Sequence, residues 1–588
     1  MQVEIINNIE NLSNYKAEWN SILTENHNDI PFLEIDFISK WWKHFGENKK
    51  LFIILLKLGD IIIGFCPLMI TKKMFWNEVN FIGYPQSNYM DLILLEKYKE
   101  DSIKTLKDYL QKSPPFSIIN LHGILKSSKN YSILEECFKK NNLKLFYSYA
   151  PVPYIKIIDS KFNEYIKHHN KHDNKATIKR QNRLKELGEL RFKLLDSENI
   201  SEIFRIHSNR WKNKMDTSNF ATSKMKGFIT DLVNDKEMSF KTEINVLTLN
   251  NRVLGFKCGF KHNGRYLGYI SGHDNSFSIY GIGKIMIIEK IKECFEDSSI
   301  ESTKTYDFSI GYEEYKFLWT NTMDFACKLI FPTKNVFTYL TFILFYLKEK
   351  TIMLLKRNRK IVLFKRNTLG KIKYFVSHDN FQSVKKDFLY SLRHQGISKL
   401  IKSTSSKLIK TFYYHVEYTV LKKDIIVNKL NIENHEYKIT EMSINDLEAL
   451  TNAMHKKTEE IILHFYKRQK CFKVYMNDRV LAYAWVDFSE IFIIDANYRK
   501  NIKNQEAFLC DLFMIENNEI NSDFESVTSA LSDFLLKNYC NVLYFTEDKM
   551  HRITSLIKAN FLPYYTINFK RILPKGNCKI IERPKISK

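Results

Sequence analysis

Two glycines stand one residue apart in the stretch YGIGKIMIIEK, where an apolar helical pattern begins. Glycine permits backbone conformations that other residues avoid, so neighbouring N–H groups can converge on an anion, and a helix N-terminus adds positive potential. The stretch predicts either a cradle for a phosphate-bearing cofactor or a turn without chemistry. The residues of the predicted cradle are Tyr280, Gly281, Ile282, Gly283 and Lys284.

The spacing of these glycines excludes two familiar phosphate loops. A P-loop requires GxxxxGK followed by Ser or Thr, whereas Ile285 follows Lys284 and no glycine stands five positions before Gly283. A dinucleotide-binding fingerprint requires a third glycine at the position of Met286. Other phosphate cradles remain compatible with the sequence.

Four side chains near this stretch or upstream of it are candidates for chemistry. Asp274, on the turn before the glycines, is a candidate base, although a loop cap would use the same residue. Asp307 lies in an apolar strand, where a carboxylate costs free energy unless paired, so it predicts a catalytic group or a buried ion pair. His207 and Trp211 share a helix face and predict either an acceptor pocket, with His207 as base, or a packed pair.

A basic segment precedes these residues, and it is expected to form one long helix over about 160–187. This helix is either a solvated face or a grip for the phosphates of a cofactor, a lipid-linked sugar or tRNA. The cations in its second half include Lys175, Lys179, Arg180, Arg183 and Lys185. His168 and His172 share a face as zinc ligands would, but the surrounding lysines oppose a cation, so no metal is predicted.

The bulk composition narrows the classes of protein. A net charge of +24 favours an anionic partner such as nucleic acid, acidic lipid or a polyanionic cofactor, although an AT-rich bacterial genome would also enrich lysine. The nine cysteines stand singly, which argues against a zinc knuckle or a disulfide framework. The N-terminus lacks a signal-peptide pattern, and the apolar run at 336–347 is shorter than the roughly 20 residues that span a bilayer. We therefore expect a cytoplasmic protein, either free or attached to the inner face of the membrane.

One pattern recurs three times along the chain: an antiparallel meander of strands, a helix, and a further strand. This pattern predicts an α+β (mixed α/β) fold with mostly antiparallel sheets flanked by helices. The expected domains are 1–150, 151–331 and 381–588. The basic segment 332–380 between them is expected to be a linker helix or an amphipathic segment on an anionic membrane surface.

Several motifs in order resemble the GNAT-like acyltransferases of the CelD/BcsL type, which accompany cellulose and envelope polysaccharide synthesis. They are the first helix PFLEIDFISKWWKHFG, the basic helix ending in Gly188, IHSNRW, the glycine stretch and YDFSIGYEEYKFLW. The last of these holds Asp307, Phe308, Gly311, Glu313, Tyr315 and Lys316. The resemblance covers about residues 20–330. Fem-type peptidoglycan aminoacyltransferases share this tandem architecture and remain an alternative family for this sequence.

The resemblance implies tandem GNAT-like domains with acyl-CoA, most simply acetyl-CoA, bound in the second. The reaction would be the attack of an amine on a thioester, with an amino sugar or another envelope precursor as acceptor. Tyr315 would then donate a proton to the leaving thiolate, and Lys316 would lie near the thioester, with Trp211, Arg180 and Arg183 lining the substrate. Two alternatives stay open: a Fem-type transferase that uses aminoacyl-tRNA, and a non-catalytic scaffold in a polysaccharide assembly complex.

The C-terminal segment also looks GNAT-like but departs from the pattern at the cofactor loop. No glycine occurs between Gly396 and Gly576, and the sequence at the expected loop is NNEINSDFES. A phosphate cradle of this type needs a glycine for its backbone conformation. We therefore predict that residues 381–588 form a degenerate domain that does not bind acyl-CoA.

Overall fold

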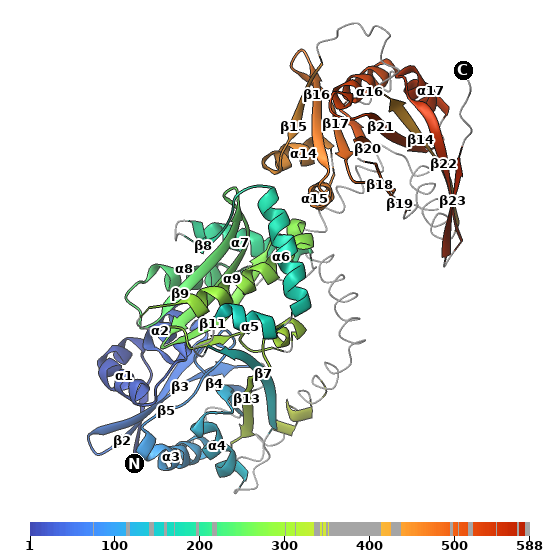
Figure 1. Cartoon of the computed structure of the whole chain (residues 1–588). Helices are drawn as coiled ribbons and strands as arrows, with labels where there is room; N and C mark the ends of the chain where they lie inside the picture. Colours follow the sequence, from blue (N-terminus) through green and yellow to red (C-terminus); the bar gives the residue numbers. More distant parts are fainter. Residues whose placement is uncertain are drawn as a thin grey trace. The chain divides into compact units, whose positions relative to one another are not determined.

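The chain divides into two compact units, Met1–Leu184 with Glu189–Tyr374, and Lys185–Gly188 with Phe375–Lys588 (Figure 1). The structure, a computed structural model, describes two main stretches and a few residues between 342 and 351. The first stretch is 1–333, without 74–75, 113–117, 140–145, 158–160, 170, 196–198, 214–219, 221, 300–301 and 312. The second is 413–582, without 425–436, 455, 494–497, 504, 516–520, 548–549 and 573–574.

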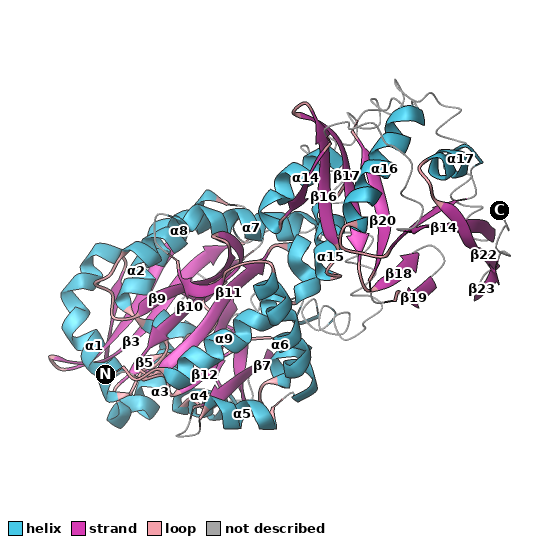
Figure 2. Cartoon of the chain, turned by 45° about the horizontal axis from the view of Figure 1, so that its top comes forward, coloured by secondary structure: helices cyan, strands magenta, loops and turns pink. Residues whose placement is uncertain are grey.

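The first unit is built on one large mixed sheet with helices on both faces (Figure 2). Its strands are β1 (Gln2–Ile6), β2 (Lys49–Leu58), β3 (Ile61–Lys72), β4 (Asn77–Phe81), β5 (Ile93–Leu94), β6 (Ile118–Leu125), β7 (Phe146–Lys156), β8 (Leu190–Leu194), β9 (Lys241–Leu249), β10 (Arg252–His262), β11 (Arg265–His273), β12 (Thr305–Asp307) and β13 (Met323–Pro332). Its helices within the described residues up to 333 are α1 (Lys16–Glu25), α2 (Ile35–Phe45), α3 (Lys99–Lys112), α4 (Lys129–Lys139), α5 (Phe162–His168), α6 (Lys171–Glu186), α7 (Ile200–Asn213), α8 (Ser223–Asn234) and α9 (Ile282–Glu296).

The strand order joins two halves through a central strand. The sheet runs β1-β2-β3-β4-β6-β13-β7-β12-β11-β10-β9-β8, and β5 pairs with β3. β7 pairs with β13 on one edge and with β12 on the other. β13 follows the second half in the sequence but lies between β6 and β7. The domain boundary expected after residue 150 falls inside β7.

Local turn chemistry explains the meanders. β2 and β3 meet at Gly59, whose φ is +61°. Asn250 and Asn251, with φ of +48° and +65°, join β9 to β10, and Asn263 and Gly264 join β10 to β11. Asn and Gly are the residues that tolerate such left-handed positions in tight hairpins. These turns produce the antiparallel meanders that the sequence pattern predicts.

The large sheet has a core on each face. On one face, Phe256 and Phe260 of β10 pack with residues of α2, α7 and α8. On the other face, Tyr266 and Tyr306 pack with α9 and with Tyr165 of α5. Small residues on β10 let α9 approach, because a Cβ on Gly255 would lie 2.9 Å from side-chain atoms of both Ile282 and Met286.

The second unit repeats the same construction in its own sheet, of order β15-β16-β17-β20-β21-β14-β22-β23. Its strands are β14 (Tyr413–Asp424), β15 (Lys438–Met442), β16 (Lys470–Met476), β17 (Arg479–Asp487), β18 (Glu490–Ile493), β19 (Tyr498–Asn501), β20 (Glu506–Met514), β21 (Asn541–Glu547), β22 (Leu562–Ile572) and β23 (Lys575–Glu582). The helices in the described part of this unit are α14 (Leu447–Met454), α15 (Thr458–Tyr466), α16 (Asn521–Leu536) and α17 (Met550–Lys558).

Among the described residues, a crossover between two parallel strands, with a helix between them, occurs three times. It joins β4 to β6 through α3, β11 to β12 through α9, and β20 to β21 through α16. Each crossover follows an antiparallel strand pair, β3–β4, β10–β11 or β17–β20, which fits the recurring pattern expected from the sequence. The residues between β20 and α16 that would correspond to the glycine stretch lie mostly outside the described residues.

One helix prediction is wrong. The basic segment forms two helices, α5 and α6, because His169 takes an extended conformation (φ −112°, ψ +126°). The Asn174 side chain in α6 donates to the His169 carbonyl at 2.7 Å, which stabilises the break. The basic segment 352–380 lies outside the described residues. Within the described part of the chain, no helix is long and apolar enough to cross a bilayer.

The close approach of α9 to β10 yields a stability test. Gly255→Ala should lower the free energy of unfolding of the first unit by about 1–3 kcal/mol, because the added methyl group overlaps Ile282 and Met286. Gly268→Ala is the matched control, since a Cβ there would meet its neighbours only at 3.4 Å or more. Chemical denaturation of both variants measures the difference. Equal stabilities would contradict the packing described.

Candidate functional site

The glycine stretch forms a left-handed turn into α9. Gly281, with φ +70° and ψ +40°, ends a 3-10 helix over Asn275–Tyr280 and begins α9. Its N–H donates to Ser278 at 2.9 Å, and its carbonyl accepts from Lys284 N–H at 2.9 Å. The N–H groups of Ile282 and Gly283 occupy the first turn, where a helix offers no acceptor of its own. This geometry is suited to bind an anion at the positive end of a 15-residue helix.

Two basic side chains from other elements flank this turn. The position that a Cβ on Gly281 would take is 3.2 Å from Nη1 of Arg180, which α6 contributes. The corresponding position on Gly283 is 3.8 Å from Nδ1 of His273, at the end of β11. α6 is held against α9 by the Gln181 amide, which donates to Glu289 at 2.6 Å. The structure therefore brings Arg180 to the predicted cradle.

The strands beneath this turn diverge. β11 and β12 pair in parallel only from Arg265 with Thr305 to Leu267 with Asp307, although β11 continues to His273. After Asp307 the chain stays alongside β7, with which β12 already pairs, and Phe308 N–H donates to the Pro153 carbonyl at 3.0 Å. The β11–β12 ladder therefore ends at Leu267, and the rest of β11, which leads to the glycine turn, does not pair with β12.

A β-bulge marks the same part of β11. Cys258 pairs with Ile270 and Gly259 pairs with Gly268, so Tyr269 is the extra residue. Such bulges redirect backbone groups and often accompany active sites. The Tyr269 hydroxyl donates to the Gln86 carbonyl at 3.0 Å, which fixes the bulge against a loop of the N-terminal half.

Asp307 lies in a fully buried hydrogen-bond network. Its carboxylate accepts from Arg265 Nη1 at 2.6 Å, from the Tyr89 hydroxyl at 2.9 Å and from Ser309 N–H at 2.6 Å. Arg265 also pairs with Asp29 at 2.9 Å. Burial raises the pKa of Asp307, and Arg265 opposes that shift. The structure thus shows the buried ion pair that was the alternative for Asp307, and its catalytic role stays a prediction.

The contacts that the loop between β4 and β5 makes with the site were not predicted from the sequence. Besides Gln86 and Tyr89, it contributes Asn88, whose amide donates to Ser309 Oγ at 2.6 Å. This loop therefore contacts both β11 and the chain that follows β12. The only signal in the sequence is a polar run, PQSNYMD, between two apolar strands.

The remaining candidate side chains lie in varied surroundings. Asp274 caps the 3-10 helix by accepting from Ser276 N–H at 3.0 Å, and it pairs with Arg252 at 3.1 Å. His207 is 2% exposed and packs edge-on against Phe220. Trp211 belongs to α7, but its side chain lies outside the described residues. These contacts fit the loop-cap and packing alternatives, and the catalytic roles stay predictions.

Lys316 and Tyr315 differ in their surroundings. Lys316 is 4% exposed, and its Nζ donates to the Ile310 and Ser309 carbonyls at 2.9 and 3.2 Å and pairs with Glu313 at 3.0 Å. It therefore organises the turn that follows β12. Tyr315 is 40% exposed. Arg183 of α6 is half-buried. The roles of these three residues at the site stay predictions.

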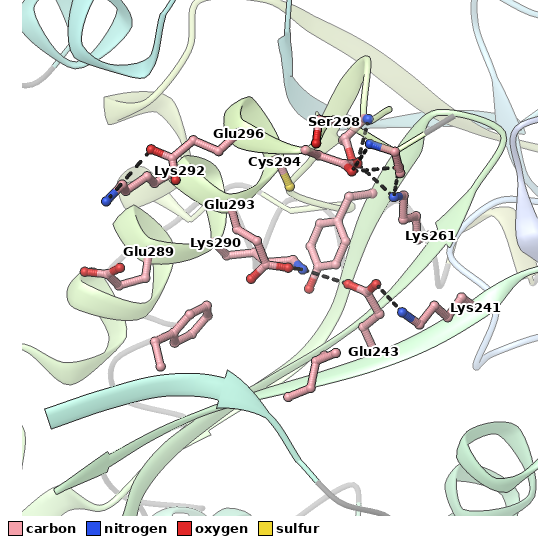
Figure 3. A pocket seen from close by; sticks show the side chains of 16 residues that line it. Lys241, Glu243, Lys261, Glu289, Lys290, Lys292, Glu293, Cys294, Glu296 and Ser298 are labelled. Carbon is pink, nitrogen blue, oxygen red and sulfur yellow. Dashed lines mark hydrogen bonds and ion pairs between the residues drawn. The ribbon is translucent and has the colours of Figure 1, made fainter. Parts of the chain in front are cut away.

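A cavity of about 810 Å³ lies along the C-terminal half of α9 (Figure 3). Opposite charges line it in pairs: Lys290 contacts Glu243 and Glu293, each at 2.7 Å. The cavity does not include the glycine turn, which is at the other end of α9. Among the described residues, no group of three His, Cys, Asp or Glu side chains could hold a metal ion.

Comparison with known proteins identifies one domain of the chain. Residues 172–317 match the family model of the acetyltransferase (GNAT) domain. This range contains α6, the glycine turn and the divergent strands. The predicted fold class, GNAT-like with mostly antiparallel sheets flanked by helices, is confirmed. The match does not reach the narrower CelD/BcsL type, which stays a prediction. No curated protein matches the chain.

Solved structures of low identity resemble part of the chain. FemX is 10% identical, covers 55% of this chain and 97% of its own length, and has a TM-score of 0.40. L-PGS from Bacillus licheniformis is 11% identical, and the match covers 56% of this chain and 95% of L-PGS, with a TM-score of 0.34. A tandem GNAT protein from the clavulanic acid biosynthesis pathway is 6% identical, and the match covers 56% of this chain and 98% of that protein, with a TM-score of 0.32.

The buried pair Arg265–Asp307 yields a pH-dependent prediction. Arg265→Met should destabilise the first unit by about 3–5 kcal/mol near neutral pH, because it leaves a buried carboxylate without its cation. A buried carboxyl with a raised pKa stabilises the fold at low pH and loses that contribution as pH rises. The loss in Arg265→Met should therefore shrink as pH falls.

The double variant Arg265→Met with Asp307→Asn is the control for this experiment. It removes both charges and should recover most of the lost stability at neutral pH. Denaturant unfolding at several pH values measures both variants. A loss that is independent of pH, or one that the double variant leaves unchanged, would show that the charge of Asp307 is not the cause.

Proposed function

We propose that the first unit transfers an acyl group from acyl-CoA, most simply acetyl-CoA, to the amine of an amino sugar or another cell-envelope precursor. One observation carries the proposal: the left-handed Gly281 places the N-terminus of α9 and Arg180 together beside the diverging strands. The position of this turn inside the acetyltransferase domain match adds support.

The chain offers specific groups for each requirement of this reaction. Acyl-CoA would supply the thioester, and its phosphates would lie against Ile282 N–H, Gly283 N–H and Arg180. The backbone of β11 beyond Leu267 can align an extended arm and donate to an oxyanion. The acceptor amine must reach the same strand edge and lose a proton, for which Asp274 and His207 are the predicted bases.

The choice of an envelope acceptor comes from the sequence resemblance to the CelD/BcsL type. An amino sugar or a lipid-linked sugar is the acceptor that this resemblance implies. Peripheral attachment to the inner membrane face is part of the same proposal, because ten Lys or Arg residues lie between Lys348 and Lys373. A cytoplasmic site would give the protein access to both acyl-CoA and such precursors.

A Fem-type transferase that uses aminoacyl-tRNA is the second candidate, because α6 exposes Lys175, Lys179 and Lys185 while Arg180 is directed to Gly281. Exposed cations of this kind bind nucleic-acid backbones in a salt-dependent manner. A scaffold without catalysis is the third, and it requires no ligand at the glycine turn. Titration with bulk tRNA at low and at physiological salt distinguishes the tRNA candidate from the acyl-CoA one.

The glycine turn provides the direct test of the acyl-CoA proposal. Gly281→Asp should weaken acetyl-CoA binding by more than tenfold relative to Gly281→Asn, because the two side chains have similar shape but only Asp adds negative charge. Both residues tolerate the left-handed conformation that this position requires. Isothermal titration calorimetry of the two variants and of the unaltered chain measures the effect. Equal affinities, or no binding to the unaltered chain, would contradict the proposal.

The second unit provides a prediction about stoichiometry. Because the segment 516–520 and its flanks contain no glycine, we expect one acetyl-CoA per chain, bound in the first unit. The same calorimetric titration reports the number of sites. A value of two, or full-strength binding that persists in Gly281→Asp, would place acyl-CoA in the second unit and contradict its assignment as degenerate.

A further inference from the structure

A lysine in the middle of β10 faces α9. Along β10, Phe256 and Cys258 point into the core formed with α2, α7 and α8. Side chains alternate along a strand, so Lys257 between them faces the opposite side, which α9 covers. The neighbouring positions on that face are Gly255 and Gly259, which carry no side chain.

Lys257 reaches the point where the β11–β12 ladder ends. A Cβ on Gly268 would lie 3.6 Å from Nζ of Lys257 and 3.4 Å from the carbonyl oxygen of Asp307. The Lys257 side chain therefore crosses β11 where that strand has no side chain. Its Nζ lies 5.3 Å from the centroid of the Tyr306 ring on β12.

The charges around Lys257 leave it without a counterion. The neighbouring ammonium of Lys290 on α9 is already paired with Glu243 and Glu293, and that of Lys316 with Glu313. Within the described part of the chain, Lys257 makes no ion pair and no side-chain hydrogen bond. Its ammonium group contacts the ring of Tyr306.

The protonation of Lys257 reflects this environment. Burial lowers the pKa of Lys257 to about 8, and Lys290 and Lys316 act in the same direction. The Cys294 thiol opposes the shift. Tyr266 and Tyr306, two tyrosines on this face, have a raised pKa because they are buried, so they are neutral. An anion at the end of the ladder would stabilise the ammonium form.

We propose that Lys257 is the proton donor to the thiolate that leaves acyl-CoA. The proposal rests on the proposed acyl transfer and assigns to Lys257 the part that sequence reasoning gave to Tyr315. A cofactor whose phosphates bind at Gly281 and whose arm follows the free part of β11 toward Gly268 would bring its sulfur to the end of the ladder. Lys257 is the described cation that lies there without a counterion.

The chemical step balances without another reactant. The acceptor nitrogen forms a bond to the thioester carbon, and the C–S bond then breaks with its electron pair going to sulfur. The Lys257 ammonium gives a proton to that sulfur, so CoA leaves as a neutral thiol. The proton lost by the acceptor nitrogen returns to the neutral amine of Lys257 through water. A donor whose pKa is close to that of a thiol is efficient in such a transfer.

The experiment measures the thiol of bound CoA and needs no acceptor. CoA and desulfo-CoA, which lacks the sulfur, are titrated into the full chain by calorimetry at several pH values between about 6 and about 10. The preference for CoA over desulfo-CoA should grow as the thiol ionises, and it should show that the thiol pKa falls by about one unit or more on binding. Lysine and thiol titrate as a coupled pair, so the apparent values belong to both.

Two variants complete the design. Lys257→Met keeps the aliphatic stem and should abolish the lowered thiol pKa while the affinity for desulfo-CoA changes less than threefold. Its melting temperature should be unchanged or higher, because no counterion is lost. Lys193→Met on β8 removes an exposed lysine and should keep the lowered thiol pKa.

The outcomes separate the two proposals. No binding of CoA to the unaltered chain would overturn the proposed function. Binding of CoA with an unshifted thiol pKa in the unaltered chain would overturn only the role of Lys257, and this holds even if the Met variant does not fold. A folded Lys257→Met that retains the lowered thiol pKa would also overturn it.

Discussion

The buried pair between Arg265 and Asp307 is the constraint on which the site depends. It joins the first residue of β11 to the last residue of β12, and Tyr89 brings the loop of the N-terminal half to the same carboxylate. A carboxylate that is completely buried must keep these partners, because an unpaired charge there would cost several kcal/mol. The place where the two strands separate is therefore fixed. The bulge at Tyr269, Gly268 and the ammonium group of Lys257 lie at or next to this place.

Much of the fold could be predicted because its signals are local. Asn-Asn, Asn-Gly and Leu-Gly-Asp turns located the hairpins, and the apolar periodicity after Gly283 located α9. The break between α5 and α6 was missed, since an Asn that bonds to a nearby carbonyl leaves little trace in a helical pattern. The insertion of β13 between β6 and β7 joins residues about two hundred positions apart, and a single sequence carries no sign of such a pairing.

The site was predictable to a similar extent. The left-handed conformation at Gly281 followed from the glycine pattern, and the family match agrees with the predicted fold around it. The contact between Arg180 and that turn was not visible, because it depends on how α6 packs on α9. Lys257 was overlooked for a related reason: one lysine in a chain with 90 Lys and Arg residues gains its meaning only from the glycine beside it in the neighbouring strand.

The insertion of β13 also has a consequence for biosynthesis. β6 and β7 are complete about 170 residues before β13 emerges from the ribosome, and until then neither can pair along the edge that β13 will occupy. During that interval the nascent chain exposes two unsatisfied strand edges, which are templates for wrong pairing. The sheet of the N-terminal half is therefore completed only after the second half has been synthesised. The two halves therefore fold as one unit, although each half repeats the same pattern of strands and helix.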